Sequence, residues 1–343
     1  MEDPIKLLIV DDSRLMRQVI GKIFESGNNV QVIGEAANGK EALGMIPSLK
    51  PDVITLDINM PVMDGLTALK HIMIKHPTPV VMCSTLTQEG ASTTFDTLKF
   101  GAVDFIHKPS NQQPETLEEQ CETIRKKVTM AAGVEIGAVR YLRPKARAGT
   151  SAQGTAYTHI IAICAAEGGY SALLKIIPLL SPALPTVFIA VLYESSGHVD
   201  SFVRYLDDNS SVKVERAIDA VPIESGVCYI ASGDEHVTVH SFYGEYLKVT
   251  ASPSPLHRDA IDRLMFSLAD VMSERVVGII LSGAGDDGTE GIGEILRMNG
   301  VAIVQDPKTC LFKEMAISVT NTHKVSHIIP DSKIAENINK RFS

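Results

Sequence analysis

The most constraining feature of this sequence is an alternation of short apolar runs, rich in β-branched residues, with amphipathic segments of helical period. In the first part of the chain the runs cover residues 5–10, 30–33, 53–56, 80–83 and 103–106. Short apolar runs are typical of strands buried on both faces, and strands that alternate with helices pair in parallel through right-handed crossovers. We therefore expect an α/β domain with a five-stranded parallel sheet of the flavodoxin-like type.

The same alternation returns after a basic stretch at residues 140–155, which mixes Arg and Lys with Pro, Gly, Ala and Ser and has no apolar period. Apolar runs at 159–165, 186–192, 226–230, 276–282 and 300–305 then predict a second, doubly wound α/β domain. A length of 343 residues suits two domains. We predict a first domain at 1–127, a linker at 128–156 and a second domain at 157–343.

Composition narrows the class of protein further. The apolar runs are far shorter than the roughly 18–20 residues that a membrane span needs, and no signal peptide pattern opens the chain. Five cysteines without a C-x-x-C pair fit reduced cytosolic thiols better than a disulfide framework or a zinc site. A net charge of −9 disfavours nucleic acid and anionic membranes as partners. We expect a cytoplasmic protein without membrane insertion.

Polar side chains follow four strands of the first predicted sheet, where functional groups of parallel sheets gather. They are Asp11 and Asp12 after the first strand, then Asp57, Ser84 and Lys108 at the third, fourth and fifth. Three carboxylates in one crevice need a cation, and oxygen ligands favour Mg²⁺, which commonly works with phosphate. Lys108 and Ser84 offer a charge and a hydroxyl to phosphoryl oxygens. Asp57 is then placed to attack phosphorus and form an aspartyl phosphate.

These residues, over about 5–127, resemble the receiver domain of bacterial two-component response regulators. The match includes a D-x-x-M-P-x-x-D-G stretch from Asp57 to Gly65 and a Lys-Pro pair at 108 and 109. The resemblance implies that Asp57 is phosphorylated by a histidine kinase. It also implies a Mg²⁺ site and a switch pair that transmits phosphorylation to the surface facing the second domain. The implied ligands are Asp11, Asp12, Asp57 and the backbone carbonyl of Asn59, and the switch residues are Ser84 and Phe105.

The second domain contains a G-x-G-x-x-G pattern at Gly283, Gly285 and Gly288, between a predicted strand and a predicted helix. That context is typical of dinucleotide-binding sites. However, Asp286 and Asp287 would place two negative charges where the pyrophosphate should bind. We keep dinucleotide binding as an alternative hypothesis.

The second domain, over about 157–340, resembles the catalytic domain of chemotaxis protein-glutamate methylesterases, and the receiver-linker-esterase order matches that family along the whole chain. The resemblance is carried by residues 163–169, 226–233, 281–288 and 302–306. In the family a Ser–His–Asp triad hydrolyses methyl esters of receptor glutamates or deamidates glutamine. The resemblance therefore implies chemotaxis, with methyl-accepting chemoreceptors as partners.

Compared position by position with the family, this sequence lacks two of the three triad residues. The family serine, in an I-G-A-S-T-G-G stretch, is Ala166 here, and the family histidine, in a Q-H-M-P stretch, is Tyr193. Only the aspartate is retained, as Asp287. Alanine carries no nucleophile, and a tyrosine of pKa about 10 is a poor general base at neutral pH. We predict that the domain resembles an esterase but is inactive, and that it acts by binding.

An active methylesterase with a relocated site is the main alternative. His198, Ser195 and Ser196 lie near Tyr193 in the sequence and could supply a shifted base or nucleophile. We expect Cys164 to be a buried core thiol instead.

A metal site in the second domain is a further possibility that the residues disfavour. His236 and His240 share one face of a predicted strand, but no third ligand accompanies them.

Overall fold

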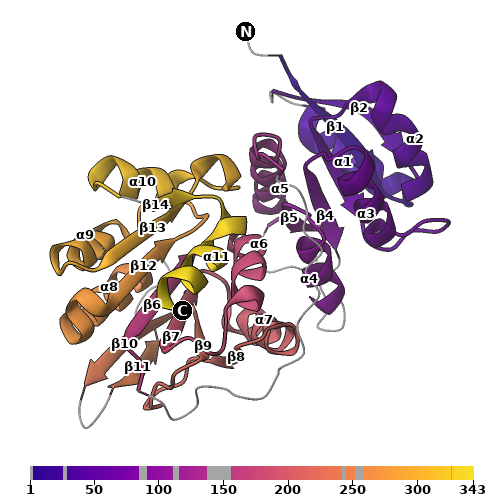
Figure 1. The fold of residues 1–343 in the computed structure, drawn as a ribbon. Helices are drawn as coiled ribbons and strands as arrows, with labels where there is room; N and C mark the ends of the chain where they lie inside the picture. Colours follow the sequence, from indigo (N-terminus) through magenta and orange to yellow (C-terminus); the bar gives the residue numbers. More distant parts are fainter. Residues whose placement is uncertain are drawn as a thin grey trace. The chain divides into compact units, whose positions relative to one another are not determined.

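A computed structural model of the chain describes residues 3–25, 29–84, 91–110, 116–136, 156–241, 245–251, 259–325 and 327–343. The chain divides into two compact units, Met1–Tyr141 and Leu142–Ser343, shown in Figure 1. The basic stretch that we predicted as a linker at 140–155 lies outside the described residues.

The first unit is the predicted α/β domain with a five-stranded sheet in the order β2-β1-β3-β4-β5, in which every neighbouring pair is parallel. Helices connect the strands in sequence, and α5 continues past residue 127, our predicted domain end. The strands are β1 (Ile5–Val10), β2 (Val30–Ala36), β3 (Val53–Asp57), β4 (Val80–Ser84) and β5 (Asp104–His107). The helices are α1 (Arg14–Glu25), α2 (Gly39–Leu49), α3 (Gly65–Lys75), α4 (Ala91–Lys99) and α5 (Leu117–Ala131).

The apolar runs of this unit form its core for the reason that the sequence suggested. All residues of β3 and β4 are buried, so helices must cover both faces of the sheet. The strand order places β1 directly beside β3, although α1, β2 and α2 lie between them in the sequence. The carboxyl ends of β1 and β3 therefore meet at the point where the strand order reverses, which is where sheets of this kind bind ligands.

The second unit has a seven-stranded parallel sheet in the order β14-β13-β12-β6-β7-β9-β8, with an antiparallel hairpin of β10 and β11 beside it. The five predicted runs form the contiguous middle of the sheet, β13-β12-β6-β7-β9. Its strands are β6 (His159–Ala165), β7 (Thr186–Leu192), β8 (Lys213–Arg216), β9 (Val227–Ser232), β10 (Glu235–Ser241), β11 (Glu245–Ala251), β12 (Val276–Ile280), β13 (Val301–Gln305) and β14 (His327–Ile329). Its helices are α6 (Gly169–Ile176), α7 (Ser196–Asn209), α8 (Ala260–Met272), α9 (Thr289–Arg297), α10 (Glu314–Thr322) and α11 (Asp331–Phe342).

The sequence analysis placed His236 and His240 on a strand, which is β10, but it did not predict β8, β14 or β11, the partner of β10 in the hairpin. The edge strands β8 and β14 have only four and three residues, too few for a clear apolar run. In contrast, every residue of β7 is buried, because helices cover both faces of the central strands (Figure 1). Among the described residues no helix is both long and apolar enough to cross a lipid bilayer.

Candidate functional sites

The acidic pocket of the first unit forms where β1, β3 and β5 end. Asp11 directly follows β1, Asp57 is the last residue of β3, and Lys108 directly follows β5. Lys108 Nζ lies 2.8 Å from Asp11 Oδ2 and 2.9 Å from Asp57 Oδ2. The structure thus brings together three of the predicted residues, and it buries both carboxylates almost completely.

A third carboxylate completes a group that could hold a cation. Asp11, Asp12 and Asp57 each offer a carboxylate oxygen, and these oxygens lie within 4.8 Å of one another. Within the described ranges this is the only group of three or more acidic, His or Cys side chains so arranged. Asp12 is exposed, so the pocket opens to solvent on its side. A donor set made only of oxygen atoms fits a hard divalent cation such as Mg²⁺.

Burial and charge act in opposite directions on the ionisable groups of this pocket. Burial raises the pKa of Asp57 above its usual value, and the nearby charge of Asp11 adds to this, although Lys108 partly offsets the effect. For Lys108 burial lowers the pKa, but hydrogen bonds to both carboxylates outweigh it and the net pKa is raised. Lys108 therefore stays protonated at neutral pH, and protons compete for Asp57 more than for an exposed aspartate.

The turn after β3 explains why the D-x-x-M-P-x-x-D-G motif ends in Asp64 and Gly65. Asp64 is the N-cap of α3, where Oδ1 accepts a hydrogen bond from Thr67 N at 2.7 Å. Gly65 N donates to Ile58 O at 2.8 Å, and a Cβ on Gly65 would lie only 2.0 Å from Asp57 O. Glycine is therefore required for α3 to start this close to the end of β3. Asn59, the predicted carbonyl ligand, lies exposed in this turn.

An arginine that the sequence analysis missed supports the acid pair. Arg17, on α1, donates from Nη1 to the backbone oxygens of Asp11 at 2.8 Å and Asp12 at 3.3 Å. Its Nε binds Glu35 Oε2, on β2, at 3.0 Å. The sequence offered one signal for this role, namely that Arg17 follows the acid pair closely and lies on the first helix. This side chain fixes the loop that presents both carboxylates.

The two predicted switch residues lie on the neighbouring strands. Ser84, the buried last residue of β4, has its Oγ 3.2 Å from Thr94 Oγ1 on α4. Phe105, on β5, is also buried, and its backbone oxygen accepts a hydrogen bond from Lys127 Nζ at 3.0 Å. The residues that follow Ser84, 85–90, lie outside the described ranges.

In the second unit the three triad positions converge at the carboxyl ends of adjacent strands. Ala166 follows β6, Tyr193 follows β7, and Asp287 lies in the loop between β12 and α9. The strand ends are tied together, since Ala166 N donates to Ser282 O at 2.9 Å and Tyr193 N donates to Ala165 O at 3.0 Å. The structure therefore brings the ends of the strands that carry the three predicted triad positions together at one edge of the sheet.

Tyr193 and Asp287 are bound directly to each other. Tyr193 OH donates to Asp287 Oδ2 at 2.5 Å and accepts a hydrogen bond from Ala260 N at 3.0 Å. The Asp287 carboxylate also accepts from the backbone N–H groups of Ile261 and Asp262, each at 3.0 Å. Together the two side chains satisfy three N–H groups at the start of α8, which would otherwise have no partner in the helix. Asp287 thus accepts hydrogen bonds at the N-terminus of α8, although the helix that follows it in the sequence is α9.

The buried carboxylate of Asp287 and the half-buried carboxylate of Asp262 interact beside this network. Burial raises the pKa of Asp287, although the hydrogen bonds from Tyr193 and from the α8 backbone lower it. Burial and the charge of Asp287 raise the pKa of Asp262 to about 6. Asp262 Oδ1 accepts a hydrogen bond from Gly291 N at 2.7 Å, so it links α8 to α9.

Ala166, at the predicted nucleophile position, is buried and packs against Gly283. A Cβ on Gly283 would lie 2.8 Å from Ala166 Cβ and 2.0 Å from Met315 Sδ. Ser282, the serine directly before Gly283, is 1% exposed. Its Oγ donates a hydrogen bond to Glu167 O at 2.8 Å and accepts one from Phe312 N at 3.0 Å.

The predicted core role of Cys164 is confirmed. The residue is fully buried in β6, where burial raises the pKa of its thiol well above the usual value.

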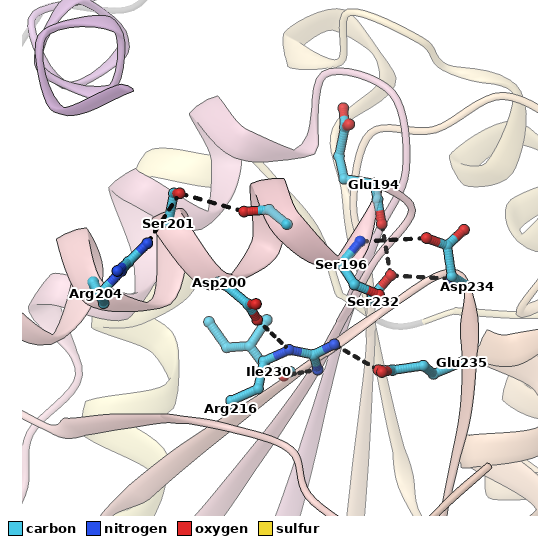
Figure 2. A network of polar contacts seen from close by, with 11 residues as sticks. Glu194, Ser196, Asp200, Ser201, Arg204, Arg216, Ile230, Ser232, Asp234 and Glu235 are labelled. Atoms are coloured by element: carbon cyan, nitrogen blue, oxygen red, sulfur yellow. Dashed lines mark hydrogen bonds and ion pairs between the residues drawn. The ribbon is translucent and has the colours of Figure 1, made fainter. Parts of the chain in front are cut away.

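The residues of the relocated-site hypothesis lie at the start of α7, and one of them, Ser196, belongs to the polar network shown in Figure 2. Ser195 is the N-cap of α7, and Ser196 N donates to Asp234 Oδ2 at 3.3 Å. His198 Nδ1 lies 3.7 Å from Glu194 Oε2. In the same network Ser232 Oγ donates to Glu194 O at 2.7 Å, and Arg216 joins Asp200 to Glu235. These contacts connect α7 to β8, β9 and β10, and so have a structural purpose.

The glycines of the G-x-G-x-x-G pattern also have structural roles. Gly288 has φ +94°, and a Cβ there would lie 2.5 Å from Ile280 Cδ1. Gly285 has φ +87°, a conformation that favours glycine. The N–H of Ala284, which lies between the first two glycines, donates a hydrogen bond to Glu167 Oε2 at 3.1 Å. Protein groups therefore occupy the loop that a pyrophosphate would need.

The histidine pair on β10 diverges in its contacts. His236 Nε2 lies 2.9 Å from Asp259 Oδ1, whereas His240 Nε2 lies 3.0 Å from Thr238 Oγ1.

The first unit has the fold and acidic pocket of a receiver domain, which makes the chain a response regulator. Residues 7–120 match the family model of the response regulator receiver domain, and residues 161–338 match that of the CheB methylesterase. The chain belongs to the CheB methylesterase family. The two domains together identify it as a response regulator of the chemotaxis type.

Named relatives agree along nearly the whole length. A protein-glutamate methylesterase/protein-glutamine glutaminase of Pyrococcus horikoshii is 37% identical, over 98% of this chain and 93% of the relative. One of Thermotoga maritima is 34% identical, over 97% of each chain. The crystal structure of the Thermotoga maritima CheB methylesterase catalytic domain matches with a TM-score of 0.51 and 27% identity, over 53% of this chain and 98% of that chain.

Proposed function

We propose that this protein is a phosphorylation-controlled, cytoplasmic response regulator whose second domain binds a partner and does not hydrolyse esters. The observation that carries the proposal is the hydrogen bond from Tyr193 OH to Asp287 Oδ2. The one retained triad residue is occupied by the side chain that replaced its histidine. Loss of both the nucleophile and the base leaves only the small residual catalysis of binding and oxyanion stabilisation.

In the receiver domain, Asp57 attacks the phosphorus of a phosphohistidine on the kinase. A bond forms between the Asp57 carboxylate oxygen and phosphorus, the P–N bond breaks, and the imidazole leaves with the electron pair. Mg²⁺, held by Asp11, Asp12, Asp57 and the Asn59 carbonyl, would neutralise charge on the carboxylates and the phosphoryl oxygens. Lys108, within 3 Å of both buried carboxylates, moves to a phosphoryl oxygen. Ser84 binds another, and Phe105 changes its packing in response.

The partner follows from the family. The relatives are named for action on protein glutamate and glutamine, so we propose that the second domain recognises the corresponding segments of methyl-accepting chemoreceptors. Two alternatives are tested against specific contacts. A relocated esterase site would use Ser195, Ser196 or His198; Ser195 makes no capping hydrogen bond with its side chain, Ser196 contacts Asp234 through its backbone N–H, and His198 Nδ1 lies 3.7 Å from Glu194 Oε2. The pyrophosphate of a dinucleotide would need the N–H of Ala284, which donates its hydrogen bond to Glu167 Oε2.

The decisive experiment measures methanol release from methylated chemoreceptor membranes, with the full chain phosphorylated by acetyl phosphate and Mg²⁺. We expect Asp57-dependent labelling, absent in Asp57→Asn, and methanol release no greater than that of a control in which the same receptor membranes are incubated without the protein. Release well above the control would refute the proposal, and loss of that release in His198→Ala would then identify a relocated base.

A further inference from the structure

Glu167 is one of three replacements in the stretch that carries the family serine; the others are Cys164 and Ala166. Glu167 directly follows Ala166 and stands where the I-G-A-S-T-G-G stretch has threonine. Its carboxylate Oε2 accepts a hydrogen bond from Ala284 N at 3.1 Å, and its backbone oxygen accepts one from Ser282 Oγ at 2.8 Å. Both ends of the residue are therefore bound to the loop between β12 and α9.

The Ala284 N–H lies beside the position of the missing nucleophile. Gly283, its neighbour, packs so closely on Ala166 that a Cβ there would approach Ala166 Cβ to 2.8 Å. The same loop carries Asp287. Hydrolases of this kind hold the acyl oxygen with backbone N–H groups next to the nucleophile. Ala284 N–H is thus placed to donate to a carbonyl or carboxylate oxygen of a bound acyl group.

We propose that the Glu167 carboxylate occupies this donor as a built-in substitute for the acyl oxygen, and so closes the former substrate pocket to carboxylates and esters. The inference rests on the proposed function, in which the pocket no longer turns over substrate. An incoming glutamate would have to displace a tethered carboxylate and approach its negative charge. The partner of the second domain must then bind at another surface, and restoring Ser and His alone would not restore an esterase.

A direct test observes the Ala284 amide by NMR. Labelling with ¹⁵N-alanine and ¹³C′-glycine selects the Gly–Ala pairs, of which the sequence has four, at Ala91, Ala102, Ala138 and Ala284. Acetate is the probe at pH 7. We expect acetate to shift the Ala284 amide in Glu167→Ala but not in wild type or in Glu290→Ala, a matched change of an exposed carboxylate on α9. An equal acetate response in wild type and Glu167→Ala would overturn the inference.

A second test restores the triad in two versions of the full chain, A166S/Y193H and A166S/Y193H/E167T. Loss of one oxyanion donor costs roughly 10²–10³ in rate, so we expect the triple variant to hydrolyse p-nitrophenyl acetate about 100-fold faster than the double. Urea unfolding establishes that both variants are folded. Equal rates, including no hydrolysis by either folded variant, would overturn the inference. Wild type is assayed beside them, and turnover by wild type would refute the proposed function without affecting this comparison.

Discussion

Gly65→Ala should separate the phosphoacceptor from the start of α3. The new Cβ would lie 2.0 Å from Asp57 O, 2.9 Å from Asp57 C and 3.0 Å from Ile58 Cα. All three are backbone atoms, so no side chain can rotate away. Cβ atoms essentially never approach other atoms closer than 3.0 Å, so Asp57 and α3 must move apart by about 1 Å. Overpacking of this kind costs about 1–3 kcal/mol of unfolding free energy. A displacement of about 1 Å at a reacting group can cost 100-fold in rate.

The assay is the rate at which the full chain is labelled at Asp57 by acetyl phosphate and Mg²⁺, together with urea unfolding. Gly44→Ala is the matched control, because Gly44 lies inside α2 and a Cβ there meets nothing within 4 Å. We expect the control to gain about 0.5–1 kcal/mol and to be labelled at the wild-type rate. If Gly65→Ala is labelled as fast as wild type and is equally stable, the steric reasoning is wrong.

Three further predictions concern the ionisable groups. Lys108→Met leaves two buried carboxylates without their cation, so it should lower the free energy of unfolding by about 3 kcal/mol at pH 7. This loss, measured by urea unfolding, should become smaller at lower pH, and a loss independent of pH would contradict the reasoning. Because burial raises the pKa of Asp57, Mg²⁺ affinity measured by calorimetry should fall, by up to about tenfold per pH unit, as the pH drops below that pKa. The same shift means that Asp57 favours folding of the metal-free protein at low pH, and this contribution is lost as the pH rises through the raised pKa; Asp57→Asn should remove both effects. Tyr193→Phe leaves Ala260 N–H without its acceptor and should cost about 1–2 kcal/mol of unfolding free energy, whereas unchanged stability would refute the capping role.

Most of the receiver domain could be predicted from the sequence, because its information is local. Apolar residues that alternate or run without interruption indicate strands, and apolar residues that recur about every 3.6 positions indicate helices. Parallel strands place their carboxyl ends at one edge of the sheet. Asp11, Asp57 and Lys108 could therefore be grouped by their positions along the chain alone, and the fold does bring them together. The missed Arg17 shows the limit of this reasoning, since two of its partners are backbone oxygens that any sequence would offer and the third, Glu35, lies on another strand.

The sequence by itself determined the alternating α/β architecture and the acidic strand ends, and its resemblance to the esterases predicted that Ala166 and Tyr193 stand where Ser and His are expected. Only the tertiary structure decided what the retained and replacing residues do. Asp287 binds the start of α8, which lies about 25 residues earlier in the chain, and Tyr193 joins it from the end of β7. Glu167 meets Ala284 across 117 positions. Such contacts depend on which strand ends become neighbours and on where a helix begins in space, and periodicity along the chain carries neither.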